Sequence, residues 1–123
     1  MPVRKIGFYI VKEVHPKRSE NLPAIQEFTE LIRKLFGSTI IDIIVYGSVA
    51  RGEDKEDSDI DILVIGRTND WRFERELIKV AYDIGLDHGV YLSIKYISQD
   101  EYHKYQSFSF YKNIQREGIS VGS

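Results

Sequence analysis

The chain has 123 residues, 42% of them apolar and 29% charged, with a formal net charge of −2; this predicts one domain over residues 1–123 and argues against a large basic surface for duplex DNA or RNA. No cysteine is present, which excludes disulfides and thiolate metal sites. No apolar run approaches the roughly 20 residues of a membrane span, and the first residues lack the apolar centre of a signal peptide, so we expect a cytoplasmic protein.

The first elements expected along the chain are a strand and a helix. Residues 3–11 contain apolar side chains in a pattern that favours a short strand. Further on, Ile25, Phe28 and Ile32 recur at spacings of three and four, which predicts an amphipathic helix over residues 22–36.

Two aliphatic strands follow this helix. Residues 40–46 are dense in β-branched side chains, which is typical of a strand buried on both faces. Residues 60–65 form a second such run, ended by Gly66. Between the two strands we expect a short helical turn over residues 48–51 and then an acidic loop.

A second helix and a third strand come next. Asn69 or Asp70 can cap a helix that runs to about Leu86. Apolar residues on its inner face recur with helical spacing. The third strand is expected over residues 90–97.

The last elements expected are two helices. A capping-box pattern at residues 98–101 opens a short helix that runs to Tyr105, and residues 107–117 form a final helix. The whole order predicts an α+β fold, a small mixed β-sheet flanked by helices.

Gly47 and Ser48 directly follow the first aliphatic strand. Glycine lets the backbone approach a ligand closely. The backbone N–H groups of the turn, with the Ser48 hydroxyl, can then bind phosphate oxygens. An isolated Gly-Ser pair is more often a plain strand-to-turn junction, so its meaning depends on its surroundings.

Asp59 and Asp61 stand at alternate positions of the second aliphatic strand. Their side chains therefore point to the same face, about 6.6 Å apart along the strand. Two carboxylates there can share one hard cation or bridge two, with phosphate oxygens and water as the remaining ligands. The alternative is a solvated strand face, but Leu63 and Ile65 continue that face as apolar residues.

The segment from residue 51 to residue 61 is strongly acidic. Six acids stand there against Arg51 and Lys55. Such a charge would repel a bare triphosphate, and bound divalent cations would invert the field. The sequence therefore predicts that a nucleotide site here requires metal, whereas residues 53–57 alone are typical of a solvated loop.

Arg51 and Ser58 are two further candidates beside the acidic pair. Arg51 can contact a phosphate. Ser58 can bond backbone N–H groups and hold the start of the strand in place. Either residue can equally be structural.

Together these residues resemble the signature of the minimal nucleotidyltransferases in the DNA polymerase beta superfamily. The order of elements over roughly residues 21–97 is similar as well. The combined motif is far more specific than any of its parts, which are Gly47-Ser48, Arg51-Gly52 and Ser58-Asp59-Ile60-Asp61.

The resemblance implies the nucleotidyltransferase fold and an enzyme of that class. It implies transfer of a nucleoside monophosphate from an NTP, with ATP the expected donor, to a hydroxyl on a protein or RNA, releasing pyrophosphate. Mg²⁺ or Mn²⁺ is the implied cofactor. The implied phosphate-binding residues are Gly47, Ser48, Arg51 and Ser58, and the implied catalytic metal ligands are Asp59 and Asp61.

The chain departs from the family pattern at one place. Active members usually carry a third carboxylate on the strand that follows the second helix. Residues 90–97 contain no acid, and Tyr91, Ser93 or Lys95 would occupy the expected face. The residues expected to bind phosphate and metal therefore match the family pattern, whereas those expected beside the acceptor do not.

Three interpretations stay open: the enzyme, a catalytically impaired nucleotide-binding module or antitoxin that binds a HEPN-type partner, and a plain domain with no retained site. The second follows from the resemblance, because similar chains often occur beside a helical HEPN-type toxin. A chain this short lacks an obvious acceptor-binding domain, so we expect a separate protein partner or a homo-oligomer. Trp71 and the aromatic residues between 102 and 111 can pack in the core, stack on a base or face that partner.

Overall fold

The computed structural model describes residues 14–122, so the strand expected over residues 3–11 lies outside the described part. The helices are α2 (Asn21–Phe36), α3 (Gly47–Arg51), α4 (Trp71–His88), α5 (Gln99–Tyr105) and α6 (Ser109–Glu117). A 3-10 turn, η2 (Gly37–Thr39), follows α2. The strands are β1 (Ile40–Tyr46), β2 (Ile60–Gly66), β3 (Leu92–Ser98) and β4 (Ile119–Ser120).

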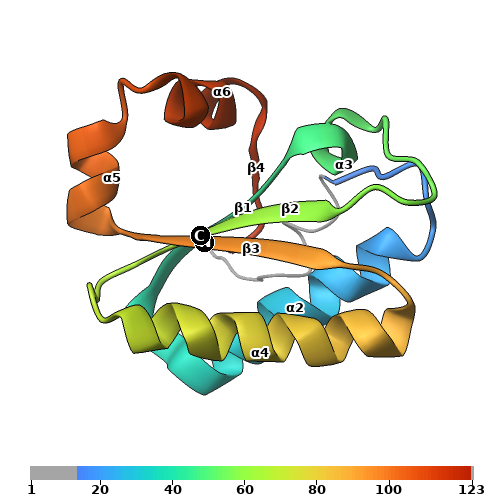
Figure 1. Ribbon diagram of the computed structural model, residues 1–123, viewed down its shortest axis with the longest axis horizontal. Helices are drawn as coiled ribbons and strands as arrows, with labels where there is room; N and C mark the ends of the chain where they lie inside the picture. The colour runs from blue at the N-terminus through green and yellow to red at the C-terminus, as the bar shows by residue number, and fades with distance from the viewer. Residues whose placement is uncertain (1–13, 123) are drawn as a thin grey trace, which may run out of the picture.

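The four strands form one mixed sheet in the order β3-β2-β1-β4 (Figure 1). β1 runs antiparallel to both β2 and β4, whereas β2 and β3 are parallel. The parallel pair is joined by α4, as a parallel connection requires a crossover. The expectation of an α+β fold with a small mixed sheet flanked by helices is confirmed.

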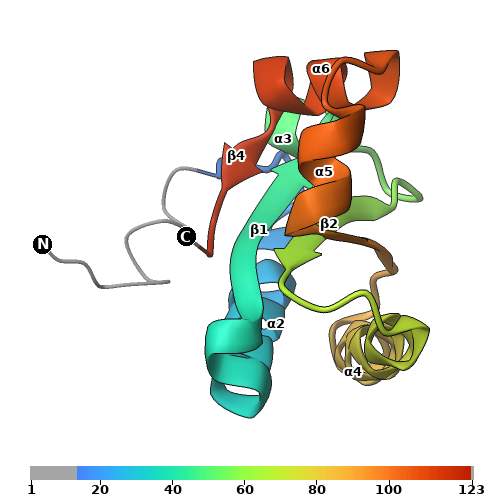
Figure 2. The ribbon, with the colours of Figure 1, turned by 90° about the vertical axis from the view of Figure 1, so that its left-hand side faces the viewer.

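Helices α2 and α4 cover one face of the sheet (Figures 1 and 2). This face holds the larger core, since every second residue of the two central strands points into it. Its fully buried side chains include Phe28, Ile32, Ile43, Ile62 and Leu77. Because β1 and β2 are also covered on the other side, they are aliphatic throughout, as the sequence predicts.

Helices α5 and α6 lie on the opposite side of the sheet (Figure 2). A second, smaller core forms there from Ile44, Leu63, Ile65, Ile97 and Ile114. Three tyrosines of α5 and α6 pack against it, namely Tyr102, Tyr105 and Tyr111. Most of the expected packing of the C-terminal aromatic residues is thus realised, although Phe108 stays 59% exposed.

The boundaries follow the expected caps with small shifts. The Asp70 side chain accepts a hydrogen bond from the backbone N–H of Arg72, and Ser98 caps α5 in the same way through the N–H of Glu101. β3 begins at Leu92 rather than at Val90, because the N–H of Val90 donates to the carbonyl of Gly85 and closes the end of α4. No pattern in the sequence predicts β4.

None of the helices within residues 14–122 combines the length and the hydropathy needed to cross a membrane.

Candidate active site

The candidate residues meet at one end of the sheet, where β1 ends and β2 begins. In the antiparallel pair, Tyr46 lies opposite Asp61. The turn that starts α3 at Gly47 therefore lies beside the first residues of β2. Residues that are 11 to 14 positions apart in the sequence are brought together by this register.

Gly47 and Asp61 are in close contact. The backbone of Gly47 has φ 75°, in the left-handed region that favours glycine. A Cβ at this position would collide with the carboxylate of Asp61. Glycine is therefore required both by the turn and by the carboxylate that lies against it.

The electrostatic surroundings of Asp61 disfavour its charge. Burial raises the pKa of the Asp61 carboxyl, and the neighbouring Asp59 charge raises it further, although Lys95 and Arg51 act in the opposite direction. A cation held between Asp59 and Asp61 would offset both the burial and the repulsion. The carboxylate pair therefore fits a hard divalent ion, for which oxygen ligands are preferred.

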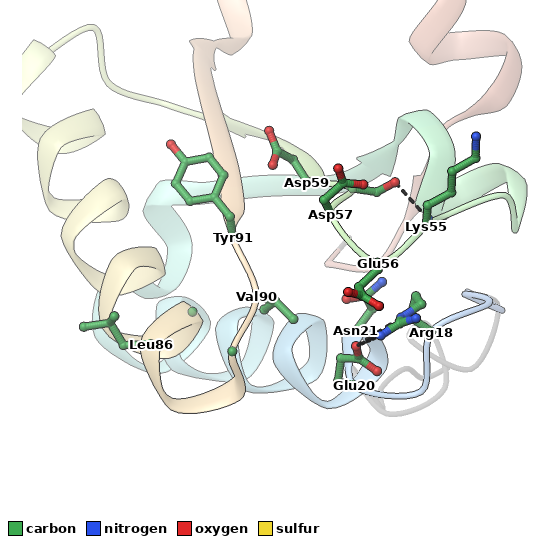
Figure 3. A pocket seen from close by; sticks show the side chains of 13 residues that line it. Arg18, Glu20, Asn21, Lys55, Glu56, Asp57, Asp59, Leu86, Val90 and Tyr91 are labelled. Atoms are coloured by element: carbon green, nitrogen blue, oxygen red, sulfur yellow. Dashed lines mark hydrogen bonds and ion pairs between the residues drawn. The ribbon is translucent and has the colours of Figure 1, made fainter.

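Asp59 is exposed and lies at the mouth of a cavity of about 370 Å³. The next residue, Ile60, donates its N–H to the carbonyl of Tyr91 at 2.9 Å, which places Asp59 beside the start of β3. In Figure 3 the side chains of Asp59 and Tyr91 point in the same direction. Asp59 lines this cavity but Asp61 and Gly47 do not; the other walls are the start of α2, the loop before β2, the end of α4 and the residues that lead into β3.

No third acid joins the pair within residues 14–122, where no group of three or more metal-ligating side chains occurs. In the parallel register Asp61 lies opposite Ser93, and Leu63 lies opposite Lys95. The position of the expected third carboxylate is thus taken by the Ser93 hydroxyl and, two pairs further, by the Lys95 ammonium group.

Tyr46, on the β1 side of Asp61, is not a substitute base. Burial raises the pKa of the Tyr46 phenol to about 12, with smaller effects from Asp61 and Tyr111. The phenol therefore keeps its proton at neutral pH.

Arg51 and Ser58 both have partners within the chain. The guanidinium of Arg51 lies 2.9 Å from Glu53 and 3.1 Å from Glu117, an ion-pair network that connects α3 to α6. The Ser58 hydroxyl accepts the N–H of Lys55 at 2.8 Å, so it closes the loop before β2. Arg51 remains partly exposed, and its charge acts on Asp61.

Asp54 is the site-supporting residue that sequence reasoning missed. Residues 53–57 read as a solvated acidic loop, yet the Asp54 side chain is fully buried. Its carboxylate accepts the N–H groups of Lys17 and Arg18 at 2.7 and 2.8 Å and the amide of Asn21 at 2.7 Å. These bonds fasten the loop that carries Asp59 to the start of α2.

Hydrogen bonding also sets the charge of Asp54. Burial alone would raise the pKa of this carboxyl, but the N–H groups of Lys17 and Arg18, with the Asn21 amide, outweigh it and hold the pKa below its ordinary value. Asp54 is therefore ionised at neutral pH. No local pattern could reveal this role, because the three donors lie 33 to 37 residues away.

Comparison with known proteins agrees with this geometry. Residues 25–119 match the nucleotidyltransferase domain family. The Methanocaldococcus jannaschii protein named "Putative protein adenylyltransferase MJ0604" is 35% identical over 95 residues, which are 77% of this chain and 91% of that protein. A second protein of the same organism, "Putative protein adenylyltransferase MJ0141", is 28% identical over 83% of this chain and 99% of its own length.

Two solved structures are similar in fold. One is described as a "putative minimal nucleotidyltransferase"; it has a TM-score of 0.53 and 24% identity, covering 85% of this chain and 95% of its own. The other is described as a "toxin-antitoxin with AMP-PNP", with a TM-score of 0.52 and 21% identity over 86% of this chain and 75% of its own.

The fold and the family match together define an enzyme of the nucleotidyltransferase class. This chain belongs to the nucleotidyltransferase domain family, as the Gly-Ser and paired-aspartate signature predicts.

Proposed function

We propose that this protein transfers a nucleoside monophosphate from ATP to a hydroxyl group of a protein, in a reaction that requires Mg²⁺ or Mn²⁺. The observation that carries the proposal is the contact between Gly47 and Asp61, with Asp59 just before β2 and near enough for its charge to raise the pKa of Asp61. It unites a turn suited to phosphates with two carboxylates suited to divalent ions.

The donor half of the site is assigned to the β1 side. Gly47 and Ser48 would receive the outer phosphates through the backbone N–H groups of the turn and the Ser48 hydroxyl. Arg51 is close enough to act on Asp61 electrostatically and is partly exposed, so it is placed to meet a phosphate oxygen after exchanging one of its two carboxylate partners. Ser58 would act through the loop, by fixing the backbone just before Asp59.

The metal would be held by Asp59 and Asp61. When bound, it neutralises charge on the phosphates and lowers the pKa of the attacking hydroxyl. The contribution of the chain is to keep two carboxylates in position despite their mutual repulsion. The buried Asp54 serves this by anchoring the loop that precedes Asp59.

The acceptor half is assigned to the β3 side. The acceptor oxygen would form a bond to the α-phosphorus while the bond to the bridging oxygen breaks, pyrophosphate leaves, and the acceptor proton passes to solvent. Tyr91, Ser93 and Lys95 flank this path from the edge strand. A protein acceptor is supported by the names of the relatives that match most of the chain.

The test is transfer of label from ATP labelled at the α-phosphate, with Mg²⁺, to protein from the source cell and to the chain itself. We expect labelling that is lost with EDTA and falls by at least about 10²-fold in Asp59→Ala or Asp61→Ala, because several kcal/mol of charge stabilisation go with the metal. Label on the γ-phosphate should not be transferred. Asp100→Ala, an exposed acid on α5, is the matched control and should keep full activity.

Labelling that survives loss of both strand acids would refute the proposal.

A second candidate is a nucleotide-binding antitoxin that holds a HEPN-type protein without transferring nucleotide. The observation that favours it is the lack of a third acid beside Asp59 and Asp61 within the described residues. Under this alternative ATP and Mg²⁺ still raise the Tm of the chain and both aspartates are still needed for that effect. No label from the α-phosphate reaches any protein.

A further inference from the structure

Helix α4 exposes a row of large apolar side chains. Trp71, Ile78, Tyr82 and Leu86, here called the α4 stripe, are between 46% and 65% exposed. Their spacings of seven, four and four place them on one face of the helix. Single exposed apolar residues need no explanation, but a continuous stripe of four marks a contact surface.

The stripe is not the core face of the helix. The buried residues of α4 are Leu77, Ala81, Ile84 and Gly85, which face α2 and the sheet. Figure 2 shows α4 end-on at the periphery of the molecule, with the other elements on one side of it.

A groove beside the stripe extends this surface. A cavity of about 120 Å³ is lined by Ile78 and Tyr82 of α4, by Tyr91 and by the first residues of β3. β3 is at one end of the strand order, so the groove lies at an edge of the sheet. Tyr91 is 59% exposed and adds a fifth large side chain.

The charges beside the stripe are divided along the helix. Arg72, Arg75 and Lys79 lie in the N-terminal part, whereas Asp83 and Asp87 lie in the C-terminal part. Glu74 and Glu76 are the two acids of the N-terminal part: the Glu74 carboxylate accepts the backbone N–H of Tyr96 at 3.3 Å, and Glu76 is paired with Lys79 at 3.6 Å. Such a surface complements itself when a second copy is turned antiparallel, because basic residues then meet acidic ones.

We propose that the α4 stripe is the interface of a homodimer in which the α4 helices of two copies pack antiparallel. With Ile78 of one copy opposite Tyr82 of the other, Arg75 lies within about one turn of Asp83 of the second copy, or about 5.4 Å along the axis. The parallel arrangement would instead place like charges together. The occupant that this charge pattern fits is therefore a second copy of the chain.

The dimer would also reach the cavity beside Asp59. Leu86 belongs to the α4 stripe and also lines that cavity, together with Val90 and Tyr91 (Figure 3). In the antiparallel arrangement, Trp71 of the second copy lies within about one turn of Leu86. The second copy would therefore add an aromatic wall at the cavity mouth; only this consequence rests on the proposed function.

The test is the mass of the purified full chain in solution, measured by sedimentation over a wide range of concentrations. We expect a reversible dimer of about twice 14.3 kDa. Ile78→Glu or Tyr82→Glu should raise the dimer Kd by about tenfold or more, since truncation of a central interface residue costs over ~1 kcal/mol. Leu35→Glu, at an exposed apolar position on α2, should leave the Kd unchanged.

A charge exchange tests the orientation. Arg75→Glu and Asp83→Arg should each weaken the dimer about two- to fivefold, and the double variant should restore it, as expected of an exposed ion pair. Circular dichroism confirms that each variant is folded. A monomer at every concentration, a dimer that Ile78→Glu leaves intact, or a double variant weaker than both single ones overturns the proposal.

Discussion

Gly47 connects the conformation of the chain to the chemistry of the site. Its backbone is left-handed, and its missing side chain leaves room for the Asp61 carboxylate. An alanine here would both strain the turn and push Asp61 aside. Nucleotide binding and stability should therefore be lost together at this position.

Gly47→Ala should lower the free energy of unfolding by about 1–2 kcal/mol from backbone strain alone, and should remove Mg²⁺-dependent binding of ATP. The matched control is Gly37→Ala. Gly37 has φ 52°, but a Cβ there meets nothing within 4 Å. Urea unfolding should show that both variants are destabilised, and calorimetric titration should show that binding is lost only in Gly47→Ala; equal binding in both would contradict this explanation.

Asp61→Asn should stabilise the metal-free protein while it abolishes function. Burial and the charge of Asp59 both disfavour the ionised Asp61 carboxylate. Removing the charge of Asp61 therefore stabilises the folded state. In EDTA we expect the Tm to rise by a few °C. With Mg²⁺ and ATP the wild type should gain stability and the variant should not, and a variant that is less stable in EDTA would contradict the prediction.

Asp54→Asn should destabilise the fold by about 1–3 kcal/mol at pH 7, because hydrogen bonds to a buried charged acceptor are weakened. The pKa of Asp54 is lowered in the folded state. Its stabilising effect is therefore complete above the unfolded pKa of about 3.9 and is lost as the pH falls through and below that value. Urea unfolding of both proteins should show a difference at pH 7 that shrinks toward pH 3; a constant difference would assign the effect to packing.

The candidate residues could be found in the sequence where their spacing is local. Gly47, Ser48, Asp59 and Asp61 stand in one short segment, and the alternation of a strand already places both acids on one face. The structural role of Asp54 could not be predicted, because the same acidic composition occurs in solvated loops and in loops that are held by a buried carboxylate. What distinguishes the two is a set of donors at the start of α2.

Among the secondary-structure elements, β4 closes the fold although it has only two residues. It pairs with β1, and the N–H of the next residue, Val121, donates to the carbonyl of Ile43. Val121 is fully buried in the main core. β4 therefore covers part of the edge of β1 that no other strand within residues 14–122 pairs with.

Val121→Ala should lower the free energy of unfolding by about 1–3 kcal/mol, since it removes buried methyl groups from a filled core. Ile78→Ala removes more apolar volume, but at an exposed position of α4. This substitution should change the free energy of unfolding by less than about 0.5 kcal/mol. Urea unfolding checks both, under conditions in which both proteins are monomeric. Equal effects would mean that β4 is not part of the cooperative fold.

The longer elements could be predicted because their patterns are long. The amphipathic spacing of α2 and the β-branched runs of β1 and β2 each extend over a whole element. β4 could not be predicted, because its two residues, Ile119 and Ser120, are too few to carry a periodicity. Its pairing is set by the position of α6, which is a property of the tertiary fold.

For the molecule as a whole, the sheet order separates three surfaces. The β1 side offers the Gly47 turn, the β3 side offers the cavity beside Asp59, and the outer face of α4 offers the apolar stripe. The resemblance in the sequence already indicated the family and the mixed sheet. The apolar spacing of α4 predicts its inner face, but it does not indicate that the large apolar residues on the opposite face stay uncovered in the fold.

The position of a bound divalent ion is the most direct test of the proposed function. Crystals grown with Mn²⁺ and a non-hydrolysable ATP analogue would locate the ion by its anomalous scattering. We predict Mn²⁺ bound to carboxylate oxygens of both Asp59 and Asp61, with the outer phosphates against Gly47 and Ser48. Nucleotide and metal bound elsewhere on the chain, with the two aspartates free, would contradict the proposal.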